Sequence, residues 1–262
     1  MTSEKSGHIE CTRAGAVVTV RLNRPDALNA LSEPMKDELG TLFAGIQRDE
    51  TVRAAVLCAS GRAFCASGDV TTMGNFSPAS AQERLKRAHR MIINLAAIEK
   101  PVICAVQGAV AGIGWSMAMA CDQIVAAEDA YFSQVFKNVG LAPDGGAIWF
   151  LTQNIGVLRA KELVLSGRRV KAQEARDLGL ISHMTSNGGQ EDQARSIAEV
   201  LARGPTLAFG YGKKLFKQVA TPTLESFLDA EAWAQGNALL SEDHKEGVRA
   251  FLEKRTPDFR GA

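Results

Sequence analysis

Among the residues whose types and spacing suggest chemistry, one acid stands out. Residues 140–146 read GLAPDGG, so Asp144 lies in a turn rich in proline and glycine, close to aromatic and aliphatic residues in the sequence. In an apolar pocket a carboxyl group has a raised pKa and can move protons. The competing interpretation is a solvated aspartate that only stabilises a β-turn. Taken alone, the segment favours this structural interpretation.

Two further segments are rich in small residues and can present backbone N–H groups. Residues 61–70 read GRAFCASGDV, and the small side chains before the aspartate allow the backbone to approach a ligand closely. Residues 107–116 read QGAVAGIGWS and are predicted to open a helix, whose first N–H groups are free donors. The three glycines of this second segment are spaced G-x-x-x-G-x-G, which matches neither a dinucleotide loop nor a nucleotide triphosphate loop.

Both glycine-containing segments follow predicted strands. Residues 54–59 and 102–107 are apolar runs typical of buried strands, and strands are also predicted at 16–22 and 123–127. Helices are predicted between them, at 34–48, 81–98 and 114–121. This alternation predicts an α/β domain with largely parallel pairing. From residue 156 onward the pattern is helical, with helices expected at 157–165, 172–178, 191–202, 207–219, 223–240 and 245–254.

The composition excludes several classes of protein. Of the 262 residues, 46% are hydrophobic and 23% charged, which argues against global disorder. The 30 basic and 29 acidic residues leave a net charge of +1, unlike a basic nucleic-acid binder. The longest apolar stretch, residues 109–121, is shorter than the roughly 20 residues that a membrane span needs. We therefore expect neither nucleic acid nor membrane as a partner.

Cysteine and histidine usage indicates a reducing compartment and no metal. The five cysteines are odd in number and contain no C-x-x-C pair, which favours reduced, buried thiols. The first nine residues are polar and lack the apolar core of a secretory signal. The four histidines show no metal-ligand spacing. The expected location is the cytoplasm.

In their order and spacing, the three segments resemble the crotonase, or enoyl-CoA hydratase/isomerase, superfamily. The resemblance extends over nearly the whole chain, through residues 22–31 (LNRPDALNAL), 161–167 (KELVLSG) and 246–255 (EGVRAFLEKR). It implies an α/β crotonase fold, with a repeated ββα core at residues 1–200 and a helical, trimerising region at 201–262. It also implies a coenzyme A thioester substrate, no permanently bound cofactor, and a homotrimer or dimer of trimers.

The resemblance also implies roles for individual residues. The backbone N–H groups of Gly68 and Ile113 correspond to an oxyanion hole for a thioester enolate, a role that needs fixed donors in a dry site. Lys254 corresponds to a residue that often reaches the coenzyme A phosphate of a neighbouring subunit. The competing interpretation of Lys254, and of Arg24, is a solvated surface charge. The positions that match coenzyme A contacts within the chain are Arg24, Ala27, Leu28, Ala66, Asp69 and Val70.

The sequence departs from the hydratases of the superfamily at two positions. The hydratases of the superfamily resemble one another in having two catalytic glutamates. Ser116 stands at the position of the first, and Phe136 near that of the second. Asp144 remains, and its turn looks most like that of the phenylacetate-pathway isomerases acting on ring-epoxide enoyl-CoA, with the simple Δ3,Δ2-enoyl-CoA isomerases next. Since isomerisation needs only one base, we expect a double-bond isomerase with Asp144 as its single acid/base. Two interpretations stay open for Trp115 and Phe136, namely packing in the core or a position near the acyl group.

Three alternatives stay open. One is an enoyl-CoA hydratase of altered activity, which would act despite Ser116 and Phe136. Another is hydrolysis like that of the 4-chlorobenzoyl-CoA dehalogenases, with Asp144 as nucleophile and His89 at the matching histidine position. The third is a coenzyme A ester-binding protein without catalysis.

Overall fold

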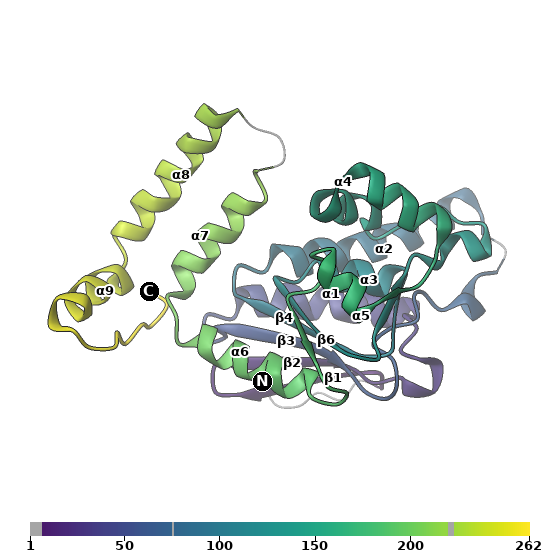
Figure 1. The fold of residues 1–262 in the computed structure, drawn as a ribbon, viewed down its shortest axis with the longest axis horizontal. Coiled ribbons are helices and arrows are strands. Elements are labelled where there is room, and N and C mark those ends of the chain that lie inside the picture. Colours follow the sequence, from purple (N-terminus) through teal and green to yellow (C-terminus); the bar gives the residue numbers. More distant parts are fainter. Residues whose placement is uncertain (1–6, 75, 220–222) are drawn as a thin grey trace.

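The computed structural model describes residues 7–74, 76–219 and 223–262, which form an α/β core with a projecting group of helices (Figure 1). The main sheet has the strand order β1-β2-β3-β4-β6-β9. Its first two strands form an antiparallel hairpin, and the others pair in parallel. The strands are β1 (Ile9–Ala14), β2 (Val17–Leu22), β3 (Ala54–Ala59), β4 (Val102–Val106), β6 (Gln123–Ala127) and β9 (His183–Thr185). The expectation of largely parallel pairing is therefore correct.

A second, three-stranded sheet has the order β5-β7-β8. It consists of β5 (Ala109–Ala111), β7 (Tyr131–Ser133) and β8 (Val170–Lys171). Residue 65 bridges to residue 110, so the first glycine-containing segment joins the edge of this sheet. These three strands and β1 and β9 were not predicted, because periodicity identifies runs of four to eight residues and most of these strands are shorter.

Helices cover both faces of the main sheet. All six residues of β3 are buried, as expected for a parallel strand between two layers. On one face the core is built with α1 (Glu33–Arg48), α2 (Pro78–Ala97), α3 (Ile113–Met119), α4 (Ala147–Ser166) and α5 (Ala172–Asp177). On the other face Ala194 and Ala198 of α6 (Gln190–Ala202) pack against Val56 and its neighbours. These small side chains bring α6 close to the sheet.

Three C-terminal helices project from this core (Figure 1). They are α7 (Thr206–Phe216), α8 (Leu224–Leu239) and α9 (Glu242–Glu253). Tyr211 and Trp233 pack edge to face across α7 and α8, with ring centroids 5.6 Å apart. The division of the chain at residue 200 stays a prediction. Within the described ranges, no helix is long and apolar enough to cross a lipid bilayer.

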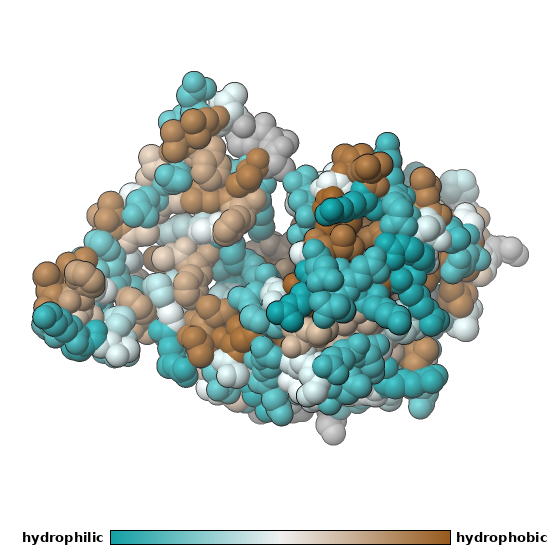
Figure 2. Space-filling view, in the orientation of Figure 1, coloured by the Kyte–Doolittle hydropathy of each residue, from teal (hydrophilic) through white to brown (hydrophobic). Residues whose placement is uncertain are grey.

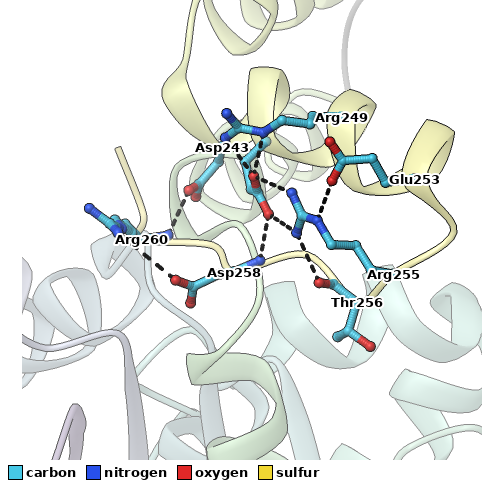
Figure 3. Close-up of polar contacts among 8 residues, drawn as sticks. Asp243, Arg249, Glu253, Arg255, Thr256, Asp258 and Arg260 are labelled. Carbon is cyan, nitrogen blue, oxygen red and sulfur yellow. Dashed lines mark hydrogen bonds and ion pairs between the residues drawn. The ribbon is translucent and has the colours of Figure 1, made fainter.

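An ionic network folds the C-terminal segment back onto α9 (Figure 3). The Glu246 carboxylate accepts hydrogen bonds from Arg249, Arg255 and the backbone N–H of Asp258. Asp243 accepts from the backbone N–H groups of residues 260 and 261. These bonds hold the pKa of Glu246 well below its usual range, mainly through Arg255. The 246–255 segment is thus built around an ion cluster that fixes the end of α9.

Most predicted helices agree with the structure within a few residues, but α4 does not. It begins at Ala147 rather than at 157, because Gly146 adopts a left-handed conformation and ends the preceding turn. Gly156, with φ 76° and ψ 163°, interrupts the helix near its middle. The predicted helix at 157–165 is therefore only the second part of α4, which starts directly after the turn that carries Asp144.

Candidate active site

The loop after β3 presents the backbone of Gly68. The N–H of Leu31 donates to the carbonyl of Ser67 at 2.9 Å, and the N–H of Asp69 donates to the carbonyl of Leu31 at 3.0 Å. These two bonds flank Gly68 and are the pair expected of a parallel bridge. Within the described ranges, no protein carbonyl accepts from the N–H of Gly68 itself. This N–H is therefore available to a ligand.

The second glycine-containing segment presents the backbone of Ile113. Ile113 is the first residue of α3, so its N–H has no acceptor within the helix. Gly112 precedes it with φ 50°, and a Cβ added there would lie 2.1 Å from the hydroxyl of Ser67. Only glycine fits this contact. Ser67 and Gly112 are therefore in contact. The N–H groups of Gly68 and Ile113 belong to the residues that directly follow this contact in each segment.

The Asp144 turn lies directly on α3. A Cβ added to Gly145, at φ 60°, would be 2.9 Å from Cγ1 of Ile113 and 3.3 Å from Cβ of Ser116. The hydroxyl of Ser116 also donates a hydrogen bond to the backbone carbonyl of Asp144 at 3.3 Å. Gly145 and Ser116 together let the acid approach the start of α3.

The environment of Asp144 favours its protonated form. Oδ1 of Asp144 is buried and has no hydrogen-bond partner among the described residues. Burial raises the pKa of Asp144, and the positive charges of Lys36, His89 and Arg84 oppose this rise. A carboxylate with a raised pKa is a stronger base once it is ionised.

A cavity of about 130 Å³ brings the three predicted catalytic residues together. Gly68, Ile113 and Asp144 all line it, with Ala66 and Val70 beside them. The grouping supplies two backbone donors and one acid on a single concave surface. Such donors stabilise an oxyanion, and the acid can move a proton on the adjacent carbon.

The aromatic and histidine candidates separate into different environments. Phe136 lines the cavity, as expected. Trp115 is fully buried, lies 5.4 Å from the Phe132 ring between centroids, and is absent from the described lining. For Trp115 the structure favours packing in the core over a position near the acyl group. His89 is exposed on α2 and is not among the described lining residues either.

Two cations at the cavity were not predicted. Lys36 is 3% exposed and Arg84 half-buried, and both line the cavity. A sequence signal for Lys36 existed, since it lies three residues before Leu39 and seven before Phe43, in the apolar stripe of its helix. The sequence carries no such signal for Arg84, because its position at the cavity depends on how α2 crosses α1.

The positions matched to coenzyme A contacts lie on two joined loops. The N–H of Ala66 donates to the carbonyl of Leu28 at 3.0 Å. Leu28 adopts a left-handed conformation at the end of the 3-10 turn Pro25–Ala27, which leaves Ala27 and Leu28 half-buried. Val70 is 57% exposed at the cavity rim. Ala66 and Val70 therefore line the cavity, and the hydrogen bond between Ala66 and Leu28 joins the other loop to it.

Arg24 and Asp69 bind each other across these loops. Nη1 of Arg24 lies 2.6 Å from the Asp69 carboxylate, which also accepts from the hydroxyl and the N–H of Thr71. These bonds, Thr71 first and then Arg24, lower the pKa of Asp69 to about 2. The pair therefore ties the loops together in addition to any ligand contact.

Lys254 lies far from this region in its own chain. It is exposed and ends α9 in a left-handed conformation, with φ 54°. Figure 1 places α9 at the opposite end of the molecule from α2 and α4. The cavity lining thus contains the predicted residues Ala66, Gly68, Val70, Ile113, Phe136 and Asp144, whereas Lys254 lies elsewhere. Among the described residues, no cluster of acids, cysteines and histidines is suited to a metal ion.

Two backbone donors and one acid lie at one cavity of this α/β framework, and such groups suit an enzyme that acts on a thioester. Comparison with known proteins gives the family. The enoyl-CoA hydratase/isomerase family matches residues 12–262. The chain belongs to this family and has the crotonase fold, whose members act on coenzyme A thioesters without a permanent cofactor.

Individual relatives carry both kinds of activity in their names. The chain is 37% identical to the 1,2-epoxyphenylacetyl-CoA isomerase of Escherichia coli (strain K12), over 94% of this chain and 95% of the relative. It is 38% identical to a probable enoyl-CoA hydratase of Rhodobacter capsulatus, over 96% of each. An enoyl-CoA hydratase structure from Polaromonas sp. JS666 superposes with a TM-score of 0.93 at 32% identity, covering 97% of this chain and all of that one. Family membership therefore does not by itself choose between isomerase and hydratase.

Proposed function

We propose that this protein is an enoyl-CoA double-bond isomerase with Asp144 as its single acid/base. The N–H groups of Gly68 and Ile113 bind the thioester oxygen and stabilise the enolate. Asp144 removes a proton from one carbon of the bound acyl group and returns it to another. The observation that carries the proposal is the single cavity lined by Gly68, Ile113 and Asp144, with the pKa of Asp144 raised by burial.

The surroundings of Ser116 argue against a two-acid hydratase. Water addition needs groups that position and deprotonate water and deliver a proton. Ser116 is fully buried and its hydroxyl donates to backbone carbonyls, while Phe136 supplies no polar group. The dehalogenase-like alternative is also disfavoured, since His89 is exposed.

Coenzyme A is proposed to bind along the two joined loops. The hydrogen bond from Ala66 to Leu28 joins the two loops, and Ala66 and Val70 line the cavity. Arg24 and Asp69 hold the loops in register through their ion pair. Lys254, held in place by the Glu246 network, is proposed to reach the coenzyme A phosphate of a neighbouring subunit.

We further propose that the protein assembles as a homotrimer or a dimer of trimers. Leu240, Phe251 and Leu252 are each more than 70% exposed on or beside α8 and α9. Figure 2 shows hydrophobic residues gathered at these projecting helices. Exposed apolar surface of this kind marks protein–protein contact. A cytoplasmic location is also proposed, supported by the five free cysteines.

The proposal is tested with purified protein and two substrates. A 3-enoyl-CoA and a 2-enoyl-CoA are supplied separately, and the absorbance of the conjugated thioester is followed. Conjugation appearing from the 3-enoyl substrate without water addition to the 2-enoyl one is the expected result. Formation of 3-hydroxyacyl-CoA would indicate a hydratase, and binding without turnover would indicate a non-catalytic protein.

A further inference from the structure

A buried charge cluster beside the cavity does not itself carry the proton in the proposed transfer. The Lys36 ammonium donates to Oε1 of Glu33 at 2.7 Å, and Nη1 of Arg84 lies 2.6 Å from the same oxygen. Both cations line the cavity, whereas Glu33 is not among its described lining residues. Two cations at the cavity therefore share one carboxylate oxygen.

Lys36 has more hydrogen-bond donors than it has acceptors among the described residues. An ammonium group has three donors, and among the described residues Lys36 donates to one acceptor, Glu33. At 3% exposure, bulk water reaches this group poorly. An unused donor on a buried charge costs free energy, so an acceptor oxygen placed in the cavity would be stabilised. Lys36 thus provides a binding position for a ligand oxygen.

Arg84 extends this position toward the oxyanion hole. Its Nη2 would lie 3.6 Å from a Cβ added to Gly68, so the guanidinium lies beside the first oxyanion donor. Glu33 fixes one side of the guanidinium, and the Phe76 ring lies against it at 5.7 Å from the ring centroid. The two cations therefore form a polar wall next to the point where a thioester would bind.

The charge balance selects the kind of oxygen. With Asp144 ionised as the base, Lys36 and Arg84 already face two carboxylates, Glu33 and Asp144. A carboxylate on the acyl chain would also meet Asp144 across the same cavity. A neutral oxygen escapes this repulsion and still accepts from the ammonium group.

We propose that Lys36 and Arg84 form a subsite for a neutral oxygen substituent, a hydroxyl, ether or carbonyl, on the acyl group of the substrate. This inference rests on the proposed function only in placing the acyl group in this cavity. It makes Lys36 and Arg84 residues that determine specificity rather than residues that move protons.

The test measures binding of saturated acyl-CoA thioesters by calorimetry, so that no turnover is needed. One series carries a single hydroxyl at successive carbons, one carries a terminal carboxylate, and an unsubstituted series of equal length is the reference. One hydroxyl position is expected to bind roughly ten- to a hundredfold tighter than the reference, the usual range for a hydrogen bond to a charged group. The carboxylate series is expected to show no such gain.

Lys36→Met is expected to remove this gain, and the exposed Lys86→Met on α2 is the matched control that keeps it. If Lys36→Met does not fold, Arg84→Met is measured instead. No gain at any hydroxyl position in the unmodified protein would overturn the subsite, as would tightest binding of the carboxylate series. If the unmodified protein binds one hydroxyl position preferentially but isomerises no 3-enoyl-CoA, that result would count against the proposed function alone. Failure of every acyl-CoA to bind would count against both.

Discussion

The hydroxyl of Ser116 donates a hydrogen bond to the backbone carbonyl of Asp144, with 3.3 Å between the two oxygens. Ser116 stands at the position where the hydratases carry a glutamate, and it lies directly beneath the turn that holds the acid. A larger side chain there would press on Gly145, whose added Cβ already lies 3.3 Å from Cβ of Ser116. The small residue at 116 and the acid at 144 therefore form one structural arrangement.

Replacing Ser116 with alanine should therefore loosen the Asp144 turn. We expect a stability loss of roughly 0.5–1.5 kcal/mol, the usual contribution of one hydrogen bond, together with a lower kcat. Ser133→Ala is the matched control, because Ser133 is also buried and donates to the carbonyl of Gly167 away from the cavity lining. Chemical denaturation and isomerase kinetics measure both effects. A kcat that falls equally in both variants would show that Ser116 has no special role in the turn.

Removal of the base tests Asp144 directly. Asp144→Asn keeps the size of the side chain and should lower kcat by roughly 10²–10⁴-fold, the usual contribution of a general acid or base. Binding of a saturated acyl-CoA should persist, because the N–H groups of Gly68 and Ile113 are unchanged. Asp177→Asn, on exposed α5, is the control with the same chemical change. Activity that survives in Asp144→Asn would point away from the single-base mechanism.

Asp144→Asn should lower activity but raise the stability of the folded protein at neutral pH. Burial raises the pKa of Asp144, so the native protein keeps the proton to higher pH than the unfolded chain does. Stability contributed by this group is therefore fully present below the ordinary aspartate pKa of about 3.9, and is lost as the pH rises through the native pKa. An asparagine side chain cannot ionise, so the Asp144→Asn variant should have the higher Tm at neutral pH.

Calorimetry across the acid-to-neutral range measures this difference. The gap in Tm between Asp144→Asn and the unmodified protein should widen as pH rises through the window between the two pKa values, and then become constant. A gap that is independent of pH would mean that the carboxyl group is not destabilised by ionisation in the folded state.

Lys36 should set the pH at which the base becomes active. Among the charges that lower the pKa of Asp144, that of Lys36 has the largest effect, followed by those of His89 and Arg84. The charge of Glu33 raises this pKa. Lys36→Met removes that contribution, so the acid limb of the kcat/KM profile should move to higher pH. The exposed Lys86→Met should leave the limb in place. An unshifted limb in Lys36→Met would mean that solvent screens this charge from Asp144.

The fold and much of the site could be predicted because their signals are local. Apolar runs identified β3 and β4, and the spacing of glycines together with the family resemblance placed Gly68 and Ile113 at backbone turns. Asp144 was identified by its turn and by the same resemblance. In each case the chemistry depends on backbone geometry, which short sequence patterns specify.

The remaining features depend on contacts between distant segments. The sequence left two interpretations open for Trp115, and the structure packs its ring beside Phe132 in the core. Arg84 reaches the cavity only through the crossing of α1 and α2, where Glu33 holds it. No spacing in a single sequence encodes such contacts, so the place of Trp115 stayed open and Arg84 was missed.

The exposed apolar residues of α9 should decide the oligomeric state. Phe251 is 83% exposed, which is unfavourable for an aromatic side chain unless another surface covers it. Light scattering should give the mass of a trimer or of a dimer of trimers for the unmodified protein, and monomers for Phe251→Asp. An aromatic residue central to an interface contributes roughly 2 kcal/mol or more. Lys86→Asp, an exposed charge change on α2, should leave the mass unaltered.

Lys254 links this assembly to ligand binding. If it reaches the coenzyme A phosphate of a neighbouring subunit, Lys254→Ala should weaken acyl-CoA binding in the assembled protein. The loss should be about fivefold at low salt, because a partly exposed ion pair contributes on the order of 1 kcal/mol and is screened by ions. In the Phe251→Asp background the same substitution should have no effect, since no neighbour is present. An equal loss in both backgrounds would place the Lys254 contact within its own chain, despite the position of α9 opposite α2 and α4.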